Sequence, residues 1–443
     1  MTNQNGALDK FFKLSEHGTN VRTEIIAGIT TFMTMGYILA VNPFFLSQAG
    51  MDAGAVFTAT VISSFIATLV MGLYANLPFA LAPGMGLNAF FAFTVVLGMG
   101  YSWQFALTAV LFEGIIFLIL TFFNVREAIL NSIPLNIKKA ISVGIGLFIA
   151  FIGLYNNGNG LILTGGGTPL AIVHDLFAPG PMVIMIGVIL ISVLLAKKVK
   201  GAIFIGILAS TVIAIPFGLV TMPDTLVQMP TAPLWLQFEF DKIMTFDFVF
   251  ILFTFLFVDM FDTVGTLIGV ATKADMLDEE GKLPGAKEAL MADAIGTTVG
   301  AMLGTSTVTT YVESASGVAE GGRTGLTAVS TAVLFLVSVF LSPLFLMIPG
   351  AATAPALIIV GLFMMSPIKD IDLDDFTESV PAFFAIIMMP LTYSISEGIM
   401  FGIMLYIILK VLVGKAKEIT PFTYIVFALF VLKLLFPVLK AMM

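Results

Sequence analysis

Long apolar runs, separated by short polar or glycine- and proline-containing stretches, extend along nearly the whole chain. A helix that crosses a membrane needs about 20 mostly apolar residues, because the hydrocarbon core is about 30 Å thick. The chain is 58% hydrophobic and only 11% charged, whereas soluble domains carry roughly 25% charged residues. Such a chain cannot solvate its surface in water. We therefore predict an all-α polytopic membrane protein.

The apolar runs form two sets of seven predicted spans. The first set covers 24–47, 54–75, 84–99, 103–123, 137–155, 181–197 and 201–220. The second set covers 247–271, 287–303, 307–321, 325–347, 352–366, 378–394 and 396–413. A further stretch, 420–439, contains Lys433 and Pro437, and it fits either an additional span or a helix at the membrane surface. The prediction is fourteen spans followed by a C-terminal segment, 414–443, that contains this stretch.

The lysine and arginine residues support this alternation of sides. Residues 1–23 are polar, without the apolar core of a signal peptide, so we expect a cytoplasmic N-terminal tail. Among the loops that then fall outside, only 221–246 carries a positive charge, Lys242. The loops and span ends that fall inside carry Arg126, Lys138, Lys139, Lys197, Lys198, Lys200, Lys273, Lys282, Lys287, Arg323, Lys369, Lys410, Lys415 and Lys417. This asymmetry is the one that the positive-inside rule predicts.

Seven spans is an odd number, so the second set must run with the opposite orientation to the first. Inverted repeats of this kind are the usual architecture of secondary transporters. The third span of each set opens with a glycine- or serine/threonine-rich segment, 82–88 and 304–310, which predicts discontinuous spans 3 and 10. Broken backbone in a membrane must face protein or water, so a substrate site is expected between them. Close helix packing through small residues is the alternative explanation for each segment.

Four acidic residues lie away from the ends of predicted spans 8, 9 and 10. Asp259 and Asp262 are three residues apart in span 8, Asp293 lies in span 9 and Glu313 in span 10. A carboxylate in a span costs at least a few kcal/mol, so such residues usually face a cavity. We expect Asp259 and Glu313 to do so, and Asp293 to hydrogen-bond the span 10 backbone. A buried carboxyl is also a natural proton carrier, so protons are the expected coupling ion. The serine- and threonine-rich backbone could also coordinate sodium, which is the less favoured alternative.

Other chemistries find little support in the sequence. Cysteine is absent and the two histidines, His17 and His174, are far apart, so no metal site, cofactor or thiol chemistry is expected. An intramembrane enzyme would need a protease or zinc motif, which we do not find. The Gly165–Gly167 run is expected to be a loop that follows no strand. We expect a transporter without a nucleic-acid partner.

Several motifs together resemble the AzgA-like purine permeases, which belong with the nucleobase–cation symporter-2 transporters. The resemblance covers essentially the whole chain, is most specific over 293–326, and is strongest to the hypoxanthine/guanine permeases of the Bacillus type. The segments that carry it are TTFMTMGYILAVNP (30–43), ALAPGMGLNAFF (80–91), VDMFDTVGTL (258–267), DAIGTTVGAMLGTSTVTTYVESASGVAEGGRTGL (293–326) and PALIIVG (355–361).

The resemblance implies a division of the fold into two domains. The core domain would comprise 24–123 and 247–348, and the gate domain 124–246 and 349–413. The gate domain commonly mediates a homodimer in this family. The implied activity is import of a purine nucleobase across the bacterial cytoplasmic (inner) membrane, by proton symport with an elevator movement of core against gate.

The resemblance also implies particular site residues. Substrate would lie between spans 3 and 10 and contact Asp259, Glu313 and Asn88, with Gly86, Thr310 and Ser314 at the same site. Asp262 and Asp293 would support the site or couple it to protons. This chain has Glu313-Ser314 where the broader family often has Gln-Asn, which fits transport of hypoxanthine, guanine or adenine. An anion exchanger or channel on the same architecture is the alternative function.

Overall fold

The computed structural model describes residues 6–123, 134–165, 168–273, 276–278 and 283–442. Within this part of the chain, nine helices are long and apolar enough to cross a membrane. They cover Val21–Gln48, Ala53–Ala75, Trp103–Phe122, Leu135–Tyr155, Pro179–Ala196, Phe246–Ala271, Gly325–Leu346, Gly350–Asp370 and Ile395–Leu412. The chain is therefore a mostly helical membrane protein, as its apolar runs predict. The predicted cytoplasmic residues Arg126 and Lys282 lie outside the described residues.

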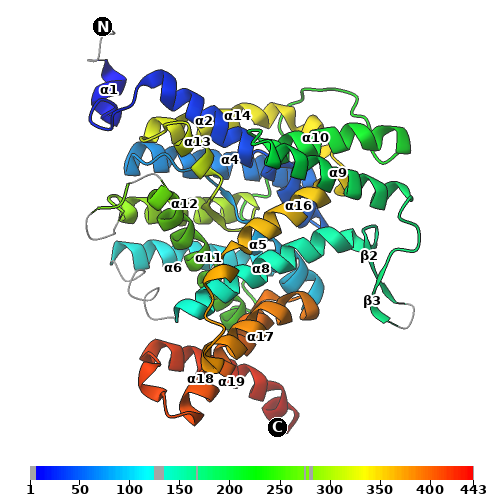
Figure 1. Cartoon of the computed structure of the whole chain (residues 1–443), viewed down its shortest axis with the longest axis vertical. Coiled ribbons are helices and arrows are strands. Elements are labelled where there is room, and N and C mark those ends of the chain that lie inside the picture. The colour runs from blue at the N-terminus through cyan, green and yellow to red at the C-terminus, as the bar shows by residue number, and fades with distance from the viewer. Residues whose placement is uncertain (1–5, 124–133, 166–167, 274–275, 279–282, 443) are drawn as a thin grey trace.

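The first half of the chain contains nine α-helices, four short 3-10 or π-helical segments and three strands among the described residues (Figure 1). In chain order they are α1 Ala7–Phe12, α2 Val21–Met35, α3 Ile38–Gln48, α4 Ala53–Val70, η1 Met71–Ala75, β1 Leu81–Pro83, α5 Met85–Ala89, η2 Phe90–Gly98, α6 Trp103–Phe122, α8 Leu135–Tyr155, η3 Asn156–Gly158, β2 Ile162–Gly165, β3 Thr168–Ile172, α9 Pro179–Ala196, α10 Ala202–Ala214 and η4 Ile215–Phe217.

The second half follows the same style of long helices with short interruptions. Its elements are α11 Phe246–Lys273, α12 Ala286–Leu303, β4 Val308–Thr310, α13 Ser314–Ala319, α14 Gly325–Ser338, η5 Val339–Leu341, α15 Ser342–Leu346, α16 Gly350–Met364, η6 Ser366–Asp370, α17 Phe376–Thr392, α18 Ile395–Leu412, η7 Ala416–Glu418 and α19 Pro421–Met442.

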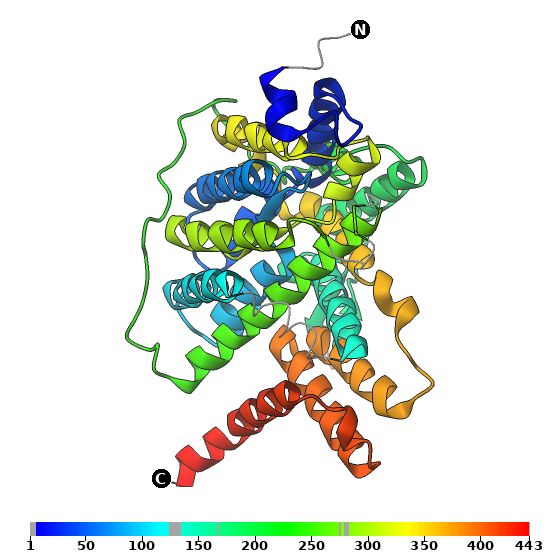
Figure 2. The ribbon, with the colours of Figure 1, turned by 90° about the vertical axis from the view of Figure 1, so that its left-hand side faces the viewer.

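The long helices pack into two groups. In the first, α2 and α4 pack on α14, α4 and α6 pack on α12, α3 packs on α4 and α5, and α11 packs on α6. Strand β4 packs on α12 in the same group. In the second, α8 packs on α16 and α17, while α9 and α10 pack on α16 and α17 packs on α18. Small residues allow the close approach in the second group: a Cβ added to Gly146 of α8 would lie 2.5 Å from the carbonyl oxygen of Gly361 in α16. Glycine at such crossings is the usual way for membrane helices to approach closely. Figure 2 shows α11 crossing the molecule obliquely.

Strands β1 and β4 form an antiparallel pair that joins the two halves of the chain. Leu81 lies opposite Thr310, and Pro83 lies opposite Val308. The pairing extends beyond the strands, because Gly84 donates to the carbonyl of Thr307 at 2.9 Å. Backbone groups that leave a helix inside a membrane need such partners, since an unpaired group there costs several kcal/mol. Both segments predicted to be broken therefore contain a short strand, and each strand is followed by a short helix, α5 or α13.

Three consecutive hydroxyl residues before β4 are each tied to a different element of the first half. Thr305 accepts from the side chain of Asn42 at 2.8 Å. Ser306 donates to Asn88 in α5, and Thr307 donates to Glu113 in α6 at 2.5 Å. Because all of these side chains are buried, their hydrogen bonds fix the approach of the chain to β4.

The structure bears on two further predicted features, the Gly165–Gly167 run and the C-terminal stretch. The prediction that the Gly165–Gly167 run follows no strand was wrong: β2 ends at Gly165 and pairs antiparallel with β3, while Gly166 and Gly167 lie outside the described residues. The stretch 420–439 forms part of a single helix, α19, which packs against α18 (Figure 2). Lys433 of α19 forms an ion pair with Glu397 at 2.6 Å.

Candidate functional site

A small cavity lies where β1 and β4 meet α3, α11 and α16. Its volume is about 60 Å³, which is enough for a few water molecules at roughly 15 Å³ each. It is lined by Tyr37, Gly84, Met85, Gly86, Asp262, Thr266, Thr309, Thr310, Tyr311, Val312, Glu313, Val360 and Met364. Most of these residues come from the first helix group, whereas Val360 and Met364 belong to α16 of the second. The cavity therefore lies at the boundary between the two groups.

Glu313 supplies one carboxylate to this cavity from the residue that precedes α13. The hydroxyl of Tyr37 donates to its Oε1 at 2.6 Å. Tyr37 is buried and lies between α2 and α3, where the first predicted span is interrupted. A charge-assisted hydrogen bond of this kind orients the carboxylate. Tyr37, at the interruption of predicted span 1, thus positions the Glu313 carboxylate of predicted span 10.

Asp262 supplies the second carboxylate from α11. Thr309 of β4 donates to its Oδ2 at a long distance, 3.4 Å. Thr266, one helical turn further along α11, also lines the cavity. The wall on this side therefore presents one acidic and two hydroxyl side chains.

Thr310 lines the cavity with a hydroxyl that has no hydrogen-bond partner among the described residues. Its side chain is buried, so the lack of a partner is costly, roughly 1–3 kcal/mol. Its neighbour Tyr311 differs, because the Tyr311 hydroxyl donates to the carbonyl of Pro83. The Thr310 hydroxyl is thus the polar group of this wall that is left for a ligand.

Asp259 is buried one turn before Thr263 and lies outside the cavity lining of the described residues. The hydroxyl of Thr263 is 3.1 Å from Asp259 Oδ1 and 2.6 Å from Asp293 Oδ1. A hydroxyl carries one hydrogen and can donate it to only one of two carboxylates. The second contact is therefore favourable when one of the two carboxyl groups is protonated.

The remaining predicted site residues have diverse positions. Gly86 lines the cavity in α5. Asn88 is buried, and its Oδ1 accepts from Ser306. The hydroxyl of Ser314 accepts from the backbone N–H of Ala80 at 3.0 Å, so this side chain ties α13 to the segment before β1. Of the predicted residues, the cavity brings together Gly86, Asp262, Thr310 and Glu313.

Some residues at or near the cavity were not expected from the sequence. Tyr37 and Tyr311 look like packing aromatics, and their polar roles depend on a fold that brings distant segments together. Glu113 is an acidic residue within the predicted span 103–123, but nothing in the sequence connects it with Thr307. No cluster of three or more His, Cys, Asp or Glu suited to a metal ion occurs among the described residues.

The site favours a neutral ligand that donates hydrogen bonds. Two carboxylates accept hydrogen bonds from N–H groups, and they would repel an anion. The Thr310 hydroxyl can donate or accept. A small planar heterocycle with several N–H groups meets these requirements.

The sequence matches a model of the Permease family over residues 22–401. The chain belongs to the Permease family. One relative, the guanine/hypoxanthine permease PbuG of Bacillus subtilis, is 46% identical, and the alignment covers 96% of this chain and 99% of the relative. The adenine permease AdeQ of Escherichia coli is 43% identical, with 98% of each chain covered. This permease is therefore a transporter and not an enzyme.

A solved structure with a similar fold is the transmembrane domain of the cyanobacterial bicarbonate transporter BicA. It superimposes with a TM-score of 0.67 at 15% identity and covers 86% of this chain and 97% of that domain. At this identity the likeness concerns the fold. The permease thus shares its helical architecture with a membrane transporter.

Proposed function

We propose that this permease is a secondary active transporter that imports purine nucleobases across the cytoplasmic membrane. The observation that carries the proposal is the pair of carboxylates, Asp262 and Glu313, on one cavity together with the unpartnered hydroxyl of Thr310. Purine bases are planar and neutral, and their N–H groups suit carboxylate acceptors. The relatives named for guanine, hypoxanthine and adenine transport support the same substrate class.

Hypoxanthine and guanine are the proposed substrates, with adenine as a further candidate. The two relatives have nearly equal identity to this chain but different substrates in their names. The Glu313-Ser314 pair fits all three bases. Competition between them therefore has to be measured.

Proton symport is the proposed coupling, and Asp259, Thr263 and Asp293 form its proposed proton site. The carboxylates of Asp259 and Asp293 are buried, and both contact the hydroxyl of Thr263. One proton bound to either carboxyl group would allow both contacts to be hydrogen bonds. Asp262 and Glu313 would then bind the base close by. Sodium is the less favoured coupling ion.

Movement of the first helix group against the second would open the site. The cavity of about 60 Å³ is far below the roughly 300–1,000 Å³ of typical ligand pockets, so a base enters only when the walls separate. The proposed core is 24–123 with 247–348, and the proposed gate is 124–246 with 349–413. Within this scheme the chain has fourteen spans as an inverted repeat, discontinuous spans 3 and 10, a cytoplasmic N-terminus and a dimer contact in the gate.

Anion transport is the competing function, because BicA has a similar fold. The acidic side chains on the cavity argue against it, since they would repel the ligand. Uptake of labelled hypoxanthine in cells that lack purine transporters separates the two. We expect unlabelled purines to compete and bicarbonate or sulfate to have no effect; competition by the anions alone would reject the proposal.

Glu313→Gln tests the site within the same assay. We expect the variant, once its insertion in the membrane is verified, to lose high-affinity uptake, because an amide cannot accept hydrogen bonds with both of its polar atoms. Uptake with unchanged affinity would remove Glu313 from the site. Collapse of accumulation by a protonophore tests the coupling, and insensitivity together with sodium dependence would contradict it.

A further inference from the structure

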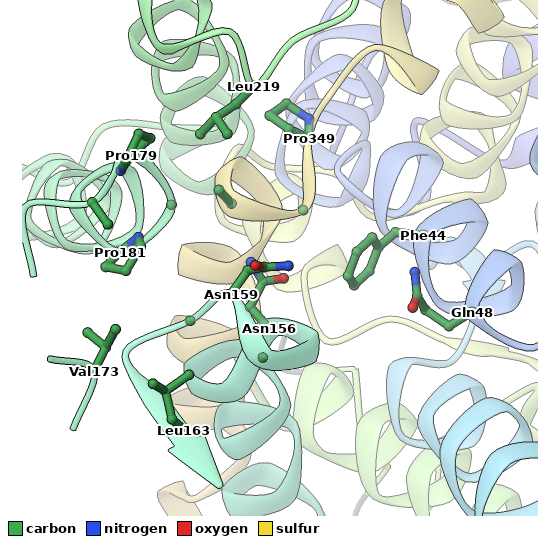
Figure 3. Close-up of a pocket in the computed structure, with 16 residues that line it drawn as sticks. Phe44, Gln48, Asn156, Asn159, Leu163, Val173, Pro179, Pro181, Leu219 and Pro349 are labelled. Atoms are coloured by element: carbon green, nitrogen blue, oxygen red, sulfur yellow. The ribbon is translucent and has the colours of Figure 1, made fainter. Parts of the chain in front are cut away.

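A second, larger cavity of about 620 Å³ lies beside the β2–β3 hairpin. We call it the hairpin cavity. Its volume falls within the roughly 300–1,000 Å³ typical of small-molecule sites. Figure 3 shows Phe44 and Gln48 of α3 on one side, and Asn156 and Asn159 facing them from the end of α8.

Asn156 is the polar side chain that most needs a ligand here. It lines the hairpin cavity and is only 8% exposed. Its side-chain amide has no hydrogen-bond partner among the described residues. Its backbone is left-handed, with φ of 40°, a conformation that asparagine tolerates better than most residues. Its amide atoms are not among the fully buried polar atoms that lack a partner, so they are open to the cavity, where a ligand or water can hydrogen-bond them.

The geometry around Gly350 shows that Asn156 and Phe44 face the same point. A Cβ added to Gly350 would lie 2.8 Å from Cε2 of Phe44 and 3.1 Å from Oδ1 of Asn156. Both side chains therefore pack closely against Gly350, where even a Cβ lacks room. A planar molecule in the neighbouring hairpin cavity, which both side chains line, could contact the aromatic ring and hydrogen-bond the amide at the same time.

Two helices begin at the hairpin cavity, and neither has a side-chain cap. They are α9, whose first residues Pro179 and Gly180 line it, and α16, whose first residues Gly350 and Ala351 line it. Pro179 and Pro181 carry no N–H, so the N–H groups that precede the hydrogen-bond ladders of these two helices are those of Gly180, Gly350 and Ala351, which lie in a region of partial positive charge. The described lining holds no charged side chain. The walls thus suit a neutral ligand with carbonyl or ring-nitrogen acceptors, and Phe44 adds an aromatic face.

We call the small cavity at Asp262 and Glu313 the central cavity. The hairpin cavity and the central cavity share two helices. At α3, Tyr37 lines the central cavity and Phe44 lines the hairpin cavity. In α16, Val360 lines the central cavity and Gly350 lines the hairpin cavity. At about 1.5 Å per residue, these separations place the two cavities about 10–15 Å apart along the helices. The hairpin cavity is thus at the end of the boundary that a ligand would follow to the central cavity.

We propose that the hairpin cavity is a second binding site for the transported base. The side-chain amide of Asn156 hydrogen-bonds an edge of the base that carries both an acceptor and a donor, and the ring of Phe44 contacts the face of the base. The base occupies this site before it reaches Glu313. This inference rests on the proposed purine transport, and with the proposed topology the hairpin cavity opens to the outer side of the membrane.

Titration of hypoxanthine into purified, full-length protein tests the proposal. Glu313→Gln removes the central site, so we expect one weaker binding event to remain in that variant. Adding Asn156→Gly, which suits the left-handed backbone, weakens the remaining event about 3- to 10-fold, the range for one neutral hydrogen bond. Adding Gly350→Leu places a bulky side chain against Phe44 and Asn156 at the wall of the cavity and abolishes the event.

Uptake by cells gives a second measurement. In an otherwise unaltered chain, Asn156→Gly and Asn159→Ala raise KM for hypoxanthine about 3- to 10-fold with an unchanged maximal rate. Gln237→Ala, an exposed amide outside the hairpin cavity, is the matched control and leaves KM unchanged.

Three results would overturn the second site. They are no residual binding in Glu313→Gln while the unaltered protein binds, residual binding that Asn156→Gly and Gly350→Leu do not weaken, or residual binding displaced by bicarbonate but not by purines. Failure of the unaltered protein to bind or transport any purine is a different result, because it rejects the proposed function itself.

Discussion

The hydroxyl of Tyr37 donates to the carboxylate of Glu313 at 2.6 Å, across 276 residues of sequence. Tyr37→Phe removes this hydrogen bond and preserves the ring. A hydrogen bond to a charged group contributes about 1.5–3 kcal/mol, so we expect KM for hypoxanthine to rise roughly 10- to 150-fold. Tyr74→Phe, at a tyrosine that is 61% exposed, is the control. Equal KM values for the two variants would show that Tyr37 does not position Glu313.

Thr310 offers a test in which stability and transport change in opposite directions. Thr310→Val replaces a buried hydroxyl that lacks a partner with a methyl group of similar size. We expect the thermal midpoint in detergent to stay the same or rise, because the unpaired group is gone. Uptake affinity should fall about 3- to 10-fold, because a ligand contact is lost.

Thr297→Val is the matched control for Thr310→Val. The Thr297 hydroxyl donates to the carbonyl of Val308 and accepts from its N–H. Its removal should lower the free energy of unfolding by about 1–3 kcal/mol. If Thr310→Val destabilises the protein as much as Thr297→Val does, the Thr310 hydroxyl has a structural role.

Gly86 is the point where α5 of the first helix group touches α8 of the second. A Cβ on Gly86 would lie 2.8 Å from Cγ2 of Ile145. Gly86→Ala should therefore lower the maximal uptake rate, because overpacking costs about 1–3 kcal/mol in this arrangement. The double variant Gly86→Ala/Ile145→Ala should recover at least half of the rate. Failure of this rescue would mean that the methyl group added by Gly86→Ala interferes with something other than α8.

Thr263 should link proton movement to transport. Thr263→Val removes the hydroxyl between Asp259 and Asp293, and we expect uptake that equilibrates the base without accumulating it. Thr263→Ser keeps the hydroxyl and should accumulate hypoxanthine in a protonophore-sensitive way. The measurement is the ratio of internal to external hypoxanthine with and without protonophore. Accumulation by Thr263→Val equal to that of the unaltered protein would exclude this proton site.

The helical, membrane-embedded character of the chain was predictable because apolar length and composition decide it. Most predicted spans overlap observed helices within a few residues; 84–99, for example, corresponds to α5 and η2. The glycine- and threonine-rich segments 82–88 and 304–310 overlap the short strands β1 and β4. Antiparallel pairing of Leu81–Pro83 with Val308–Thr310 could not be predicted, because tertiary contacts decide the partner of a three-residue strand.

The choice between Asp259 and Asp262 shows a limit of sequence reasoning. Each aspartate has a threonine one turn later, Thr263 or Thr266, so the two helical stripes look alike. Only the packing of α11 turns Asp262 and Thr266 toward the cavity. The hairpin cavity was not predictable for a similar reason, since Phe44, Asn156 and Gly350 come from three distant segments.

The pairing of β1 with β4 also bears on how the protein is made. The groups that satisfy β1 belong to a segment more than 200 residues further along the chain; Pro83 and Tyr311, for example, are 228 residues apart. While the ribosome is still synthesising the second half, the backbone of Leu81–Pro83 has no strand to pair with, and lipid offers no hydrogen bonds. The first half must therefore keep this segment in contact with water or the insertion machinery until β4 arrives. The central cavity is thus assembled last, and a chain truncated before Val308 should be recognised as incomplete by membrane quality control.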